Sequence, residues 1–376
     1  MIDITSAFDG GNIKVLSLDD ANDIRLEINK DNSSHFYQWF YFRLSGARGR
    51  SCRLRIMNAG GSAYPQGWQD YRAVASYDRE DWFRLECDFN DGVLDIHVAP
   101  EQDALWIAYF APYSMARHGD LIASAQASPR VSLRSLGHTL DGQDIDLLHV
   151  SDGIAGSKKT CWVIARQHPG ETMAEWWMEG FIGRLMDEAD PVARAVLRCA
   201  DLHVVPNMNP DGARRGHLRT NAAGANLNRE WEKPSMARSP EVFVVREAMR
   251  ATGMDFCLDV HGDEALPYNF IAGAEGTPSW NAARAAQLAA FKAALAHISP
   301  DFQTEHGYAK SAPGKANMGM CTNWTAEEFS CLSMTLEMPF KDTAGTPDEA
   351  RGWSPQRAAH LGRACLDALW ARMGDL

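Results

Sequence analysis

The chain has 376 residues, with 37 lysines and arginines against 49 aspartates and glutamates, so its formal net charge is −12. This acidic balance argues against a nucleic-acid-binding protein, because affinity for nucleic acid comes mainly from basic side chains that neutralise phosphates. Hydrophobic residues make up 45% and charged residues 23% of the chain, values that are ordinary for a folded protein and exclude a disordered one. At about 100–200 residues per domain, this length predicts two domains.

The cysteines and the uncharged stretches predict the compartment. The eight cysteines are dispersed without a CxxC pair, which favours reduced and mostly buried thiols over a disulfide or zinc-thiolate framework. The first fifteen residues lack the basic and apolar pattern of a secretion signal, and no uncharged stretch is long enough to span a membrane. We therefore expect a cytoplasmic protein with no membrane partner, and the oligomeric state stays open.

The pattern in the first third of the chain predicts β-strands. Residues 10–125 contain short alternating segments rich in aromatic residues, interrupted about every ten residues by Gly, Asn or Asp, which is typical of an antiparallel β-sandwich. The NDG sequence at 90–92, between two alternating runs, predicts a hairpin turn. A polar stretch then leads into a different pattern. We place the β-sandwich domain at 1–125 and a second domain at 126–376.

The second domain shows apolar runs that alternate with amphipathic helices. This alternation predicts an α/β fold with helices layered on both sides of a mostly parallel or mixed sheet. The segments in chain order are an apolar run at 161–166, a helix at 171–189, a run at 201–208, a run at 256–260, an Ala-rich helix at 279–298, a run at 332–340 and a C-terminal helix at 354–373.

Two residues at the strand-to-helix junction TCWVIARQHPGETMAEWW have the chemistry and the spacing of metal ligands. His168 and Glu171 lie three residues apart, after a predicted strand, where α/β folds present their ligands. Such a pair also arises by chance, and the alternative is two solvent-facing polar residues at a helix start. The chain contains a second copy of this spacing, His261 to Glu264, directly after the apolar run FCLDV.

His261 therefore stands at a second predicted strand end and is the candidate third ligand. His168, Glu171 and His261 form a His₂Glu set, which leaves the fourth zinc position free for water, as a catalytic zinc requires. Asp259 or Asp211 is the candidate to orient an imidazole, by accepting a hydrogen bond from the ring nitrogen that does not bind the metal. The alternative for His261 alone is a hydrogen-bonded core histidine.

The segment between these ligands, residues 204–233, is rich in Gly, Asn, Pro and charged side chains, and functional residues often lie on such loops. Arg219, Asn228 and Arg229 offer permanently charged planar groups and an amide, which suit the binding of a carboxylate and the stabilisation of an oxyanion. The alternative is a solvated loop whose arginines pair with nearby acidic residues, namely Glu230, Glu232 or Asp211.

Glu337 is a single carboxylate within the apolar run SCLSMTLEMPF, which predicts a buried strand. Burying an unpaired charge is costly, so such a residue pairs, becomes neutral or serves a site. Near a metal it would act as a general base. The alternative is an edge strand that exposes Glu337 to water.

Five motifs in chain order resemble those of the zinc metallocarboxypeptidases. They are HPGE at 168–171, NPDG at 209–212, the run from Arg219 to NLNREW, HGDE at 261–264 and TLEMPF at 335–340. The chain is more narrowly similar to the cytosolic carboxypeptidase subfamily, in which a β-sandwich domain precedes the catalytic domain. The segments WFYFRLSG, MNAGGS and AYFAPYS look like the amino-terminal module of that subfamily.

The resemblance implies one zinc per chain, bound by His168, Glu171 and His261. It also implies that Glu337 is the general base that activates a water molecule and later passes its proton to the leaving amine. Zinc would act as a Lewis acid and lower the pKa of water.

The same resemblance assigns the substrate contacts. Arg219 would polarise the scissile carbonyl and stabilise the oxyanion, and Asn228 with Arg229 would bind the terminal carboxylate of a peptide or protein. The expected reaction is hydrolysis of the C-terminal peptide bond, with a preference for C-terminal glutamate as in the deglutamylating members of the subfamily.

Some positions depart from the wider family pattern. Gly170 stands where the digestive enzymes have an arginine, which agrees with the cytosolic group. Tyr308 is the candidate for the mobile tyrosine of the family, and Lys310 or Lys315 the candidate for an acidic side-chain pocket.

Two other functions use the same sequence features. One is a zinc-dependent deacylase or amidase of small N-acyl amino acids. The other is a catalytically inactive binding protein whose aromatic first domain recognises carbohydrate or protein. The presence of Glu337 argues against an inactive protein, and the first domain with Asn228 and Arg229 favours peptides as substrates.

Overall fold

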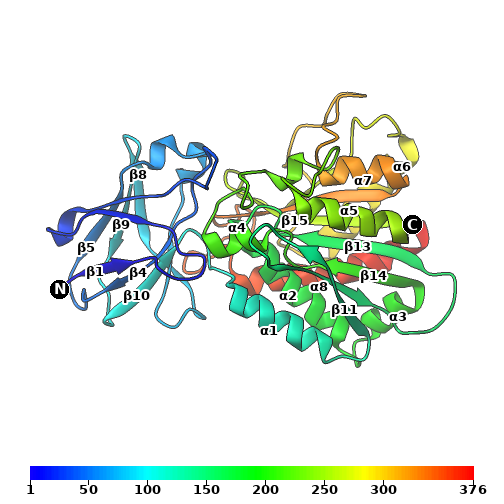
Figure 1. The fold of residues 1–376 in the computed structure, drawn as a ribbon, viewed down its shortest axis with the longest axis horizontal. Coiled ribbons are helices and arrows are strands. Elements are labelled where there is room, and N and C mark those ends of the chain that lie inside the picture. The colour runs from blue at the N-terminus through cyan, green and yellow to red at the C-terminus, as the bar shows by residue number, and fades with distance from the viewer.

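The computed structural model describes residues 1–376, which form a β-rich part next to a larger α/β part (Figure 1). The β-rich part comes first in the chain and contains two five-stranded sheets. The first sheet has the order β1 (Asp3–Thr5), β4 (Tyr41–Ser45), β10 (Ala104–Ala108), β6 (Val74–Ser76) and β7 (Phe83–Arg84). The second has the order β2 (Lys14–Ser17), β3 (Ile24–Glu27), β5 (Cys52–Ile56), β9 (Val93–Val98) and β8 (Glu86–Asn90).

The strands of both sheets run antiparallel except for β3 and β5, which are parallel neighbours. The predicted hairpin at 90–92 is confirmed, because it joins β8 to β9. Asp91 and Gly92 have φ values of 51° and 79°, the left-handed backbone that a two-residue hairpin turn requires at both central positions. Short 3₁₀ turns complete this part: η1 (Ala21–Asp23), η2 (Ala59–Gly61) and η3 (Pro65–Trp68).

The second part is built on one mixed seven-stranded sheet. Its order is β11 (Val131–His138), β12 (Asp144–Val150), β14 (Ala200–Val205), β13 (Lys159–Ala165), β15 (Phe256–Asp263), β17 (Leu332–Pro339) and β16 (Phe270–Gly273). The four central strands β14, β13, β15 and β17 are parallel, β12 and β16 pair antiparallel with them on either side, and the edge strand β11 pairs antiparallel with β12. All eight residues of β15 and of β17 are buried, as expected for parallel strands covered on both faces.

Helices cover both faces of this sheet (Figure 1). Side chains of β13 alternate between the two layers, because Cys161 and Val163 belong to the larger core cluster whereas Trp162 and Ile164 belong to the smaller one. The larger cluster includes residues of α1 (Met115–Gln126), α2 (Met173–Met186), α3 (Pro191–Cys199), α6 (Ala282–Ile298) and α8 (Pro355–Arg372). The smaller cluster includes residues of α5 (Pro240–Thr252) and α7 (Cys321–Phe329). The predicted α/β/α layers are confirmed.

Helix α1 connects the two parts along the chain and packs on the second part. It follows β10 and contacts helix α2 and strand β11 of the second part. The division of the chain after residue 125 stays a proposal. None of the helices combines the length and the apolar composition needed to cross a bilayer, and all eight cysteines are free.

The parallel strands fix the place of the candidate residues. His168 follows β13 by three residues, His261 lies near the end of β15, and Glu337 lies near the end of β17. His261 and Glu337 are direct partners in the strand register. Carboxyl ends of parallel strands meet at one edge of a sheet, which is where open α/β sheets bind ligands.

Candidate active site

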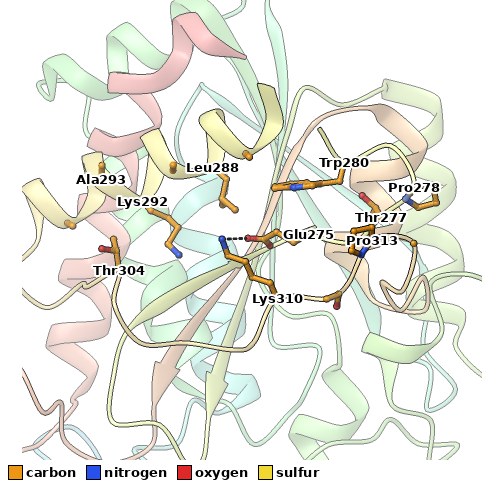
Figure 2. Close-up of a pocket in the computed structure, with 16 residues that line it drawn as sticks. Glu275, Thr277, Pro278, Trp280, Leu288, Lys292, Ala293, Thr304, Lys310 and Pro313 are labelled. Atoms are coloured by element: carbon orange, nitrogen blue, oxygen red, sulfur yellow. Dashed lines mark ion pairs between the residues drawn. The ribbon is translucent and has the colours of Figure 1, made fainter. Parts of the chain in front are cut away.

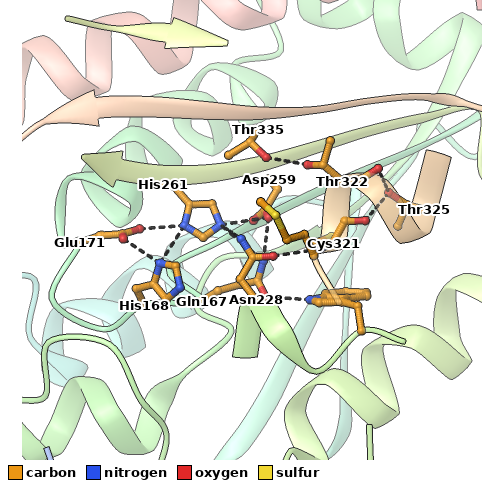
Figure 3. A network of polar contacts seen from close by, with 12 residues as sticks. Gln167, His168, Glu171, Asn228, Asp259, His261, Cys321, Thr322, Thr325 and Thr335 are labelled. Atoms are coloured by element: carbon orange, nitrogen blue, oxygen red, sulfur yellow. Dashed lines mark hydrogen bonds and ion pairs between the residues drawn. The ribbon is translucent and has the colours of Figure 1, made fainter. Parts of the chain in front are cut away.

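Three buried side chains converge at this edge of the sheet (Figure 3). His168 Nδ1 lies 2.7 Å from one carboxylate oxygen of Glu171, and His261 Nδ1 lies 2.8 Å from the other. The two Nδ1 atoms are 3.2 Å apart. At most 3% of any of these residues is exposed to solvent. The three ligand atoms lie within 4.8 Å of one another, so they can share one ion.

The outer nitrogens of both imidazoles face acceptor oxygens. His168 Nε2 is 3.0 Å from Asn226 Oδ1, and His261 Nε2 is 2.9 Å from Asp259 Oδ2. These oxygens only accept, so they favour a proton on each Nε2, and in the metal-bound form each ring would then direct the lone pair of Nδ1 inward. Two inward lone pairs and one carboxylate form a donor set that fits zinc.

The charges around His261 also favour a cation. Burial disfavours the charged imidazole, but Asp259 and Glu171 raise the pKa of His261 well above its ordinary value. Burial alone raises the pKa of the Glu171 carboxyl, whereas His168 and His261 together lower it below its ordinary value. Burial, helped by the positive charge of Arg219, lowers the pKa of His168 to about 3. Two carboxylates thus face one imidazole, an excess of negative charge that a divalent ion would neutralise.

Glu337 lies beside this cluster and is 6% exposed. Because β17 lies between β15 and β16, the alternative of an edge strand is wrong. Its Oε2 atom is buried without a hydrogen-bond partner. Burial raises the pKa of the Glu337 carboxyl well above its ordinary value, and the charge of Glu171 adds to that rise. A buried carboxyl of this kind is a candidate base.

The polar segment 204–233 supplies three further groups to the site. Arg219 Nη1 lies 4.0 Å from Glu171 Oε1, and 13% of its side chain is exposed. Asn228 accepts a hydrogen bond from the backbone N–H of Cys321 at 2.9 Å, and its amide nitrogen Nδ2 lies 3.4 Å from His261 Nε2. Arg229 Nη1 donates to the carbonyl of Asn228 at 2.5 Å. Since Arg219 and Asn228 are largely buried, the alternative of a solvated loop is wrong for them.

These groups line one cavity of about 480 Å³. Tyr308 also lines this cavity, and its hydroxyl donates to Asp263 Oδ2 at 2.6 Å. Tyr64 and Gln66 of the first domain complete the wall. The predicted site residues among its walls are His168, Glu171, Arg219, Asn228, Arg229, Tyr308 and Glu337.

A second cavity of about 350 Å³ shares Tyr308 and Glu337 with the first one. Lys292 and Lys310 line both this cavity and a larger one of about 830 Å³ beside α6 (Figure 2). Lys310 Nζ is 3.9 Å from Glu275 Oε1. Lys315 is exposed and lines neither of the two cavities that contain Glu337.

Two supporting residues had no sequence signal of their own. Asn226 holds His168, and Gln167 donates to Asp259 Oδ2 at 2.6 Å. Of the two acids considered for an imidazole, Asp259 contacts His261. Asp211 does not reach the site, because its oxygens accept from the Thr139 hydroxyl and from the backbone N–H of residue 141.

Comparisons with known proteins agree with this geometry. The model of the zinc carboxypeptidase family matches residues 121–355, and the model of the cytosolic carboxypeptidase N-terminal domain matches residues 4–110. The chain belongs to the zinc carboxypeptidase family. It is a metallocarboxypeptidase, an enzyme that hydrolyses peptide bonds.

Solved carboxypeptidases share the whole architecture. A metallo-carboxypeptidase from Burkholderia cenocepacia is 48% identical, with a TM-score of 0.98 and coverage of 100% of both chains. A metallo-carboxypeptidase from Pseudomonas aeruginosa, solved in complex with (2-guanidinoethylmercapto)succinic acid, is 43% identical, with a TM-score of 0.97 and coverage of 99% of both chains. Human cytosolic carboxypeptidase 1 is 26% identical over 73% of this chain, which spans 26% of that protein.

Proposed function

We propose that this carboxypeptidase releases the C-terminal residue of peptides or proteins in a zinc-dependent reaction. His168, Glu171 and His261 would hold one zinc per chain. The observation that carries the proposal is the pair of inward-facing imidazole nitrogens, 3.2 Å apart, with a carboxylate oxygen of Glu171 beside each ring. Bound zinc supplies Lewis acidity and lowers the pKa of water at the site.

Glu337 takes the role of the general base. Its Oε2 atom has no protein partner and is free to accept the proton of the attacking water. Because burial raises its pKa, the carboxylate binds a proton readily and can then deliver it to the leaving amine. The neighbouring position of His261 in the strand register keeps this acid close to the metal ligands.

Arg219 would polarise the scissile carbonyl and stabilise the charge that develops on its oxygen. Asn228 and Arg229 would bind the terminal carboxylate of the substrate, because both line the cavity and they supply an amide group and an exposed guanidinium. A clamp for a carboxylate next to the cleavage site explains release of only the last residue, since only a chain end carries that charge.

For the terminal residue we propose glutamate. The support is the cavity behind Tyr308 and Glu337, in which Lys292 and Lys310 offer two positive charges. Glu275, which lies 3.9 Å from Lys310 in the same wall, favours a second candidate, a basic terminal residue (Figure 2). The guanidino group of the compound bound to the Pseudomonas relative is consistent with that second candidate.

A library of peptides that differ only in the last residue tests the proposal. We expect release of single C-terminal residues, loss of activity with a chelator, and recovery with one equivalent of zinc. The released residues then separate glutamate from lysine and arginine. Hydrolysis of N-acyl amino acids without release from any peptide would favour the deacylase, and no hydrolysis of either class would favour the binding protein.

The eight free cysteines support a reducing compartment, and we propose the cytoplasm as the location of the enzyme.

A further inference from the structure

One carboxylate of the first domain is bound entirely by the loop that carries Arg219. Asp31 lies between β3 and β4 and is 2% exposed. Its oxygens accept backbone N–H bonds from Leu218 at 2.7 Å, from Arg219 at 2.8 Å and from Thr220 at 2.9 Å. The hydroxyl of Thr220 adds a fourth bond at 3.0 Å. Charged acceptors form stronger hydrogen bonds than neutral ones, so this cluster fixes the loop backbone.

The first domain also contacts the Arg219 side chain. The guanidinium carbon lies 5.7 Å from the ring centre of Phe36 and 5.2 Å from that of Tyr64. Aromatic rings at these distances attract a cation and restrict its movement. Backbone and side chain of Arg219 are thus both held by residues that precede the catalytic domain.

The opposite side of the loop lies against the metal-ligand segment. The backbone N–H of Gly170 donates to the carbonyl of Leu218 at 2.9 Å. A Cβ atom at Gly170 would approach that same oxygen to 2.9 Å, closer than such atoms normally come. The loop therefore has no free space on this side, and Asp31 closes the other side.

We propose that Asp31 is a positioning residue for peptide hydrolysis, which makes the first domain a structural part of the active site. It acts through Arg219, and the inference rests on the proposed role of Arg219 in stabilising the developing oxyanion. Without the carboxylate, three buried N–H groups lose their acceptor, and the loop must shift to satisfy them. A displacement of about 1 Å in a group that contacts the reacting atoms costs about a hundredfold in rate.

The test is a double-mutant cycle in the full-length zinc enzyme. Asp31→Asn keeps the size of the side chain but turns an amide NH₂ toward backbone donors. We expect its kcat to fall about 30- to 100-fold, with KM changed less than about threefold and zinc content unchanged. In an Arg219→Met background, the same substitution should lower kcat by less than about twofold, because its effect passes through Arg219. A general loss of structure would lower kcat in both backgrounds.

Lys341→Met is the matched control. Lys341 is 9% exposed and donates to the carbonyl of Gln69 in the first domain at 2.7 Å, so the variant removes a partly buried contact between domains without touching the Arg219 loop. We expect it to keep kcat within about threefold of the unmodified enzyme. If Asp31→Asn does not fold, Asp31→Ser keeps one oxygen acceptor and enters the same cycle.

Three outcomes separate this inference from the proposed function. An Asp31 variant with unchanged kcat, beside a slow Arg219→Met enzyme, would overturn the inference alone, and so would losses that multiply in the double variant. An Arg219→Met enzyme with unchanged kcat would overturn the proposed role of Arg219 and the inference with it.

Discussion

Glu337→Gln removes the proposed base while keeping the shape of the side chain. The residue is 6% exposed and its Oε2 has no partner, so the amide fits without breaking a protein hydrogen bond. General base catalysis contributes about 10²- to 10⁴-fold, and we expect kcat to fall about 10³-fold, equivalent to about 4 kcal/mol of barrier. Because Glu337 is not among the metal ligands, the zinc content should stay at one per chain.

The same substitution should leave stability unchanged or raise it. A buried carboxylate with a raised pKa costs free energy that a neutral amide does not, so the melting temperature should not fall. The assay is steady-state release of C-terminal residues together with zinc analysis and thermal melting of the same preparations. Glu241→Gln is the control, since Glu241 is a fully buried carboxyl outside the site with a pKa raised by burial to about 7. A Glu337→Gln enzyme with more than about a tenth of normal kcat would refute the assignment.

Two other predictions concern the metal and the pH range. Asp259→Asn should weaken zinc binding about 10- to 100-fold, measured by competition with a chelator, because the amide holds the His261 ring less firmly; unchanged affinity would contradict the orienting role. Burial opposes the charge on His118, but Glu175 and Asp146 raise its pKa from the ordinary value of about 6.5 to about 9. The stabilisation from the charged His118 beside these two acids is therefore fully present below pH 6.5 and is lost as the pH rises through 9. The loss lowers the free energy of unfolding by about 3 kcal/mol. The free energy of unfolding, measured between pH 6 and 10, should fall by this amount in the unmodified protein and not in His118→Gln. An equal dependence on pH in both proteins would contradict the role of His118.

The sequence predicted the parts of the site that depend on strand ends. His168, His261 and Glu337 each stand at or just beyond the carboxyl end of a parallel strand, and the sheet order brings those ends together. Apolar runs and helical periodicity are local, so they predicted the layers of the second domain as well.

The polar segment was harder to interpret from composition. Asn207, Asn209 and Asn221 look like loop residues, yet each is at most 1% exposed. Their side chains pair with backbone and side-chain groups, as when Asn209 donates to the carbonyl of Gln167 at 3.0 Å and Asn221 donates to the Glu241 carboxylate at 3.1 Å. Composition cannot distinguish an exposed polar loop from a buried loop whose amides are all paired.

The contribution of the first domain was not predictable from local patterns. Asp31 and the Arg219 loop are separated by 187 to 189 residues, and no spacing rule connects them. The parallel pairing of β3 with β5 in the first domain also depends on contacts outside the alternating strand pattern.

The most direct test of the account is an anomalous diffraction map recorded at the zinc absorption edge from crystals of the unmodified enzyme. The account predicts a single strong peak about 2.0–2.2 Å from the Nδ1 atoms of His168 and His261 and from the Glu171 carboxylate. No peak at that position, in a preparation that still removes C-terminal residues at its full rate, would contradict it.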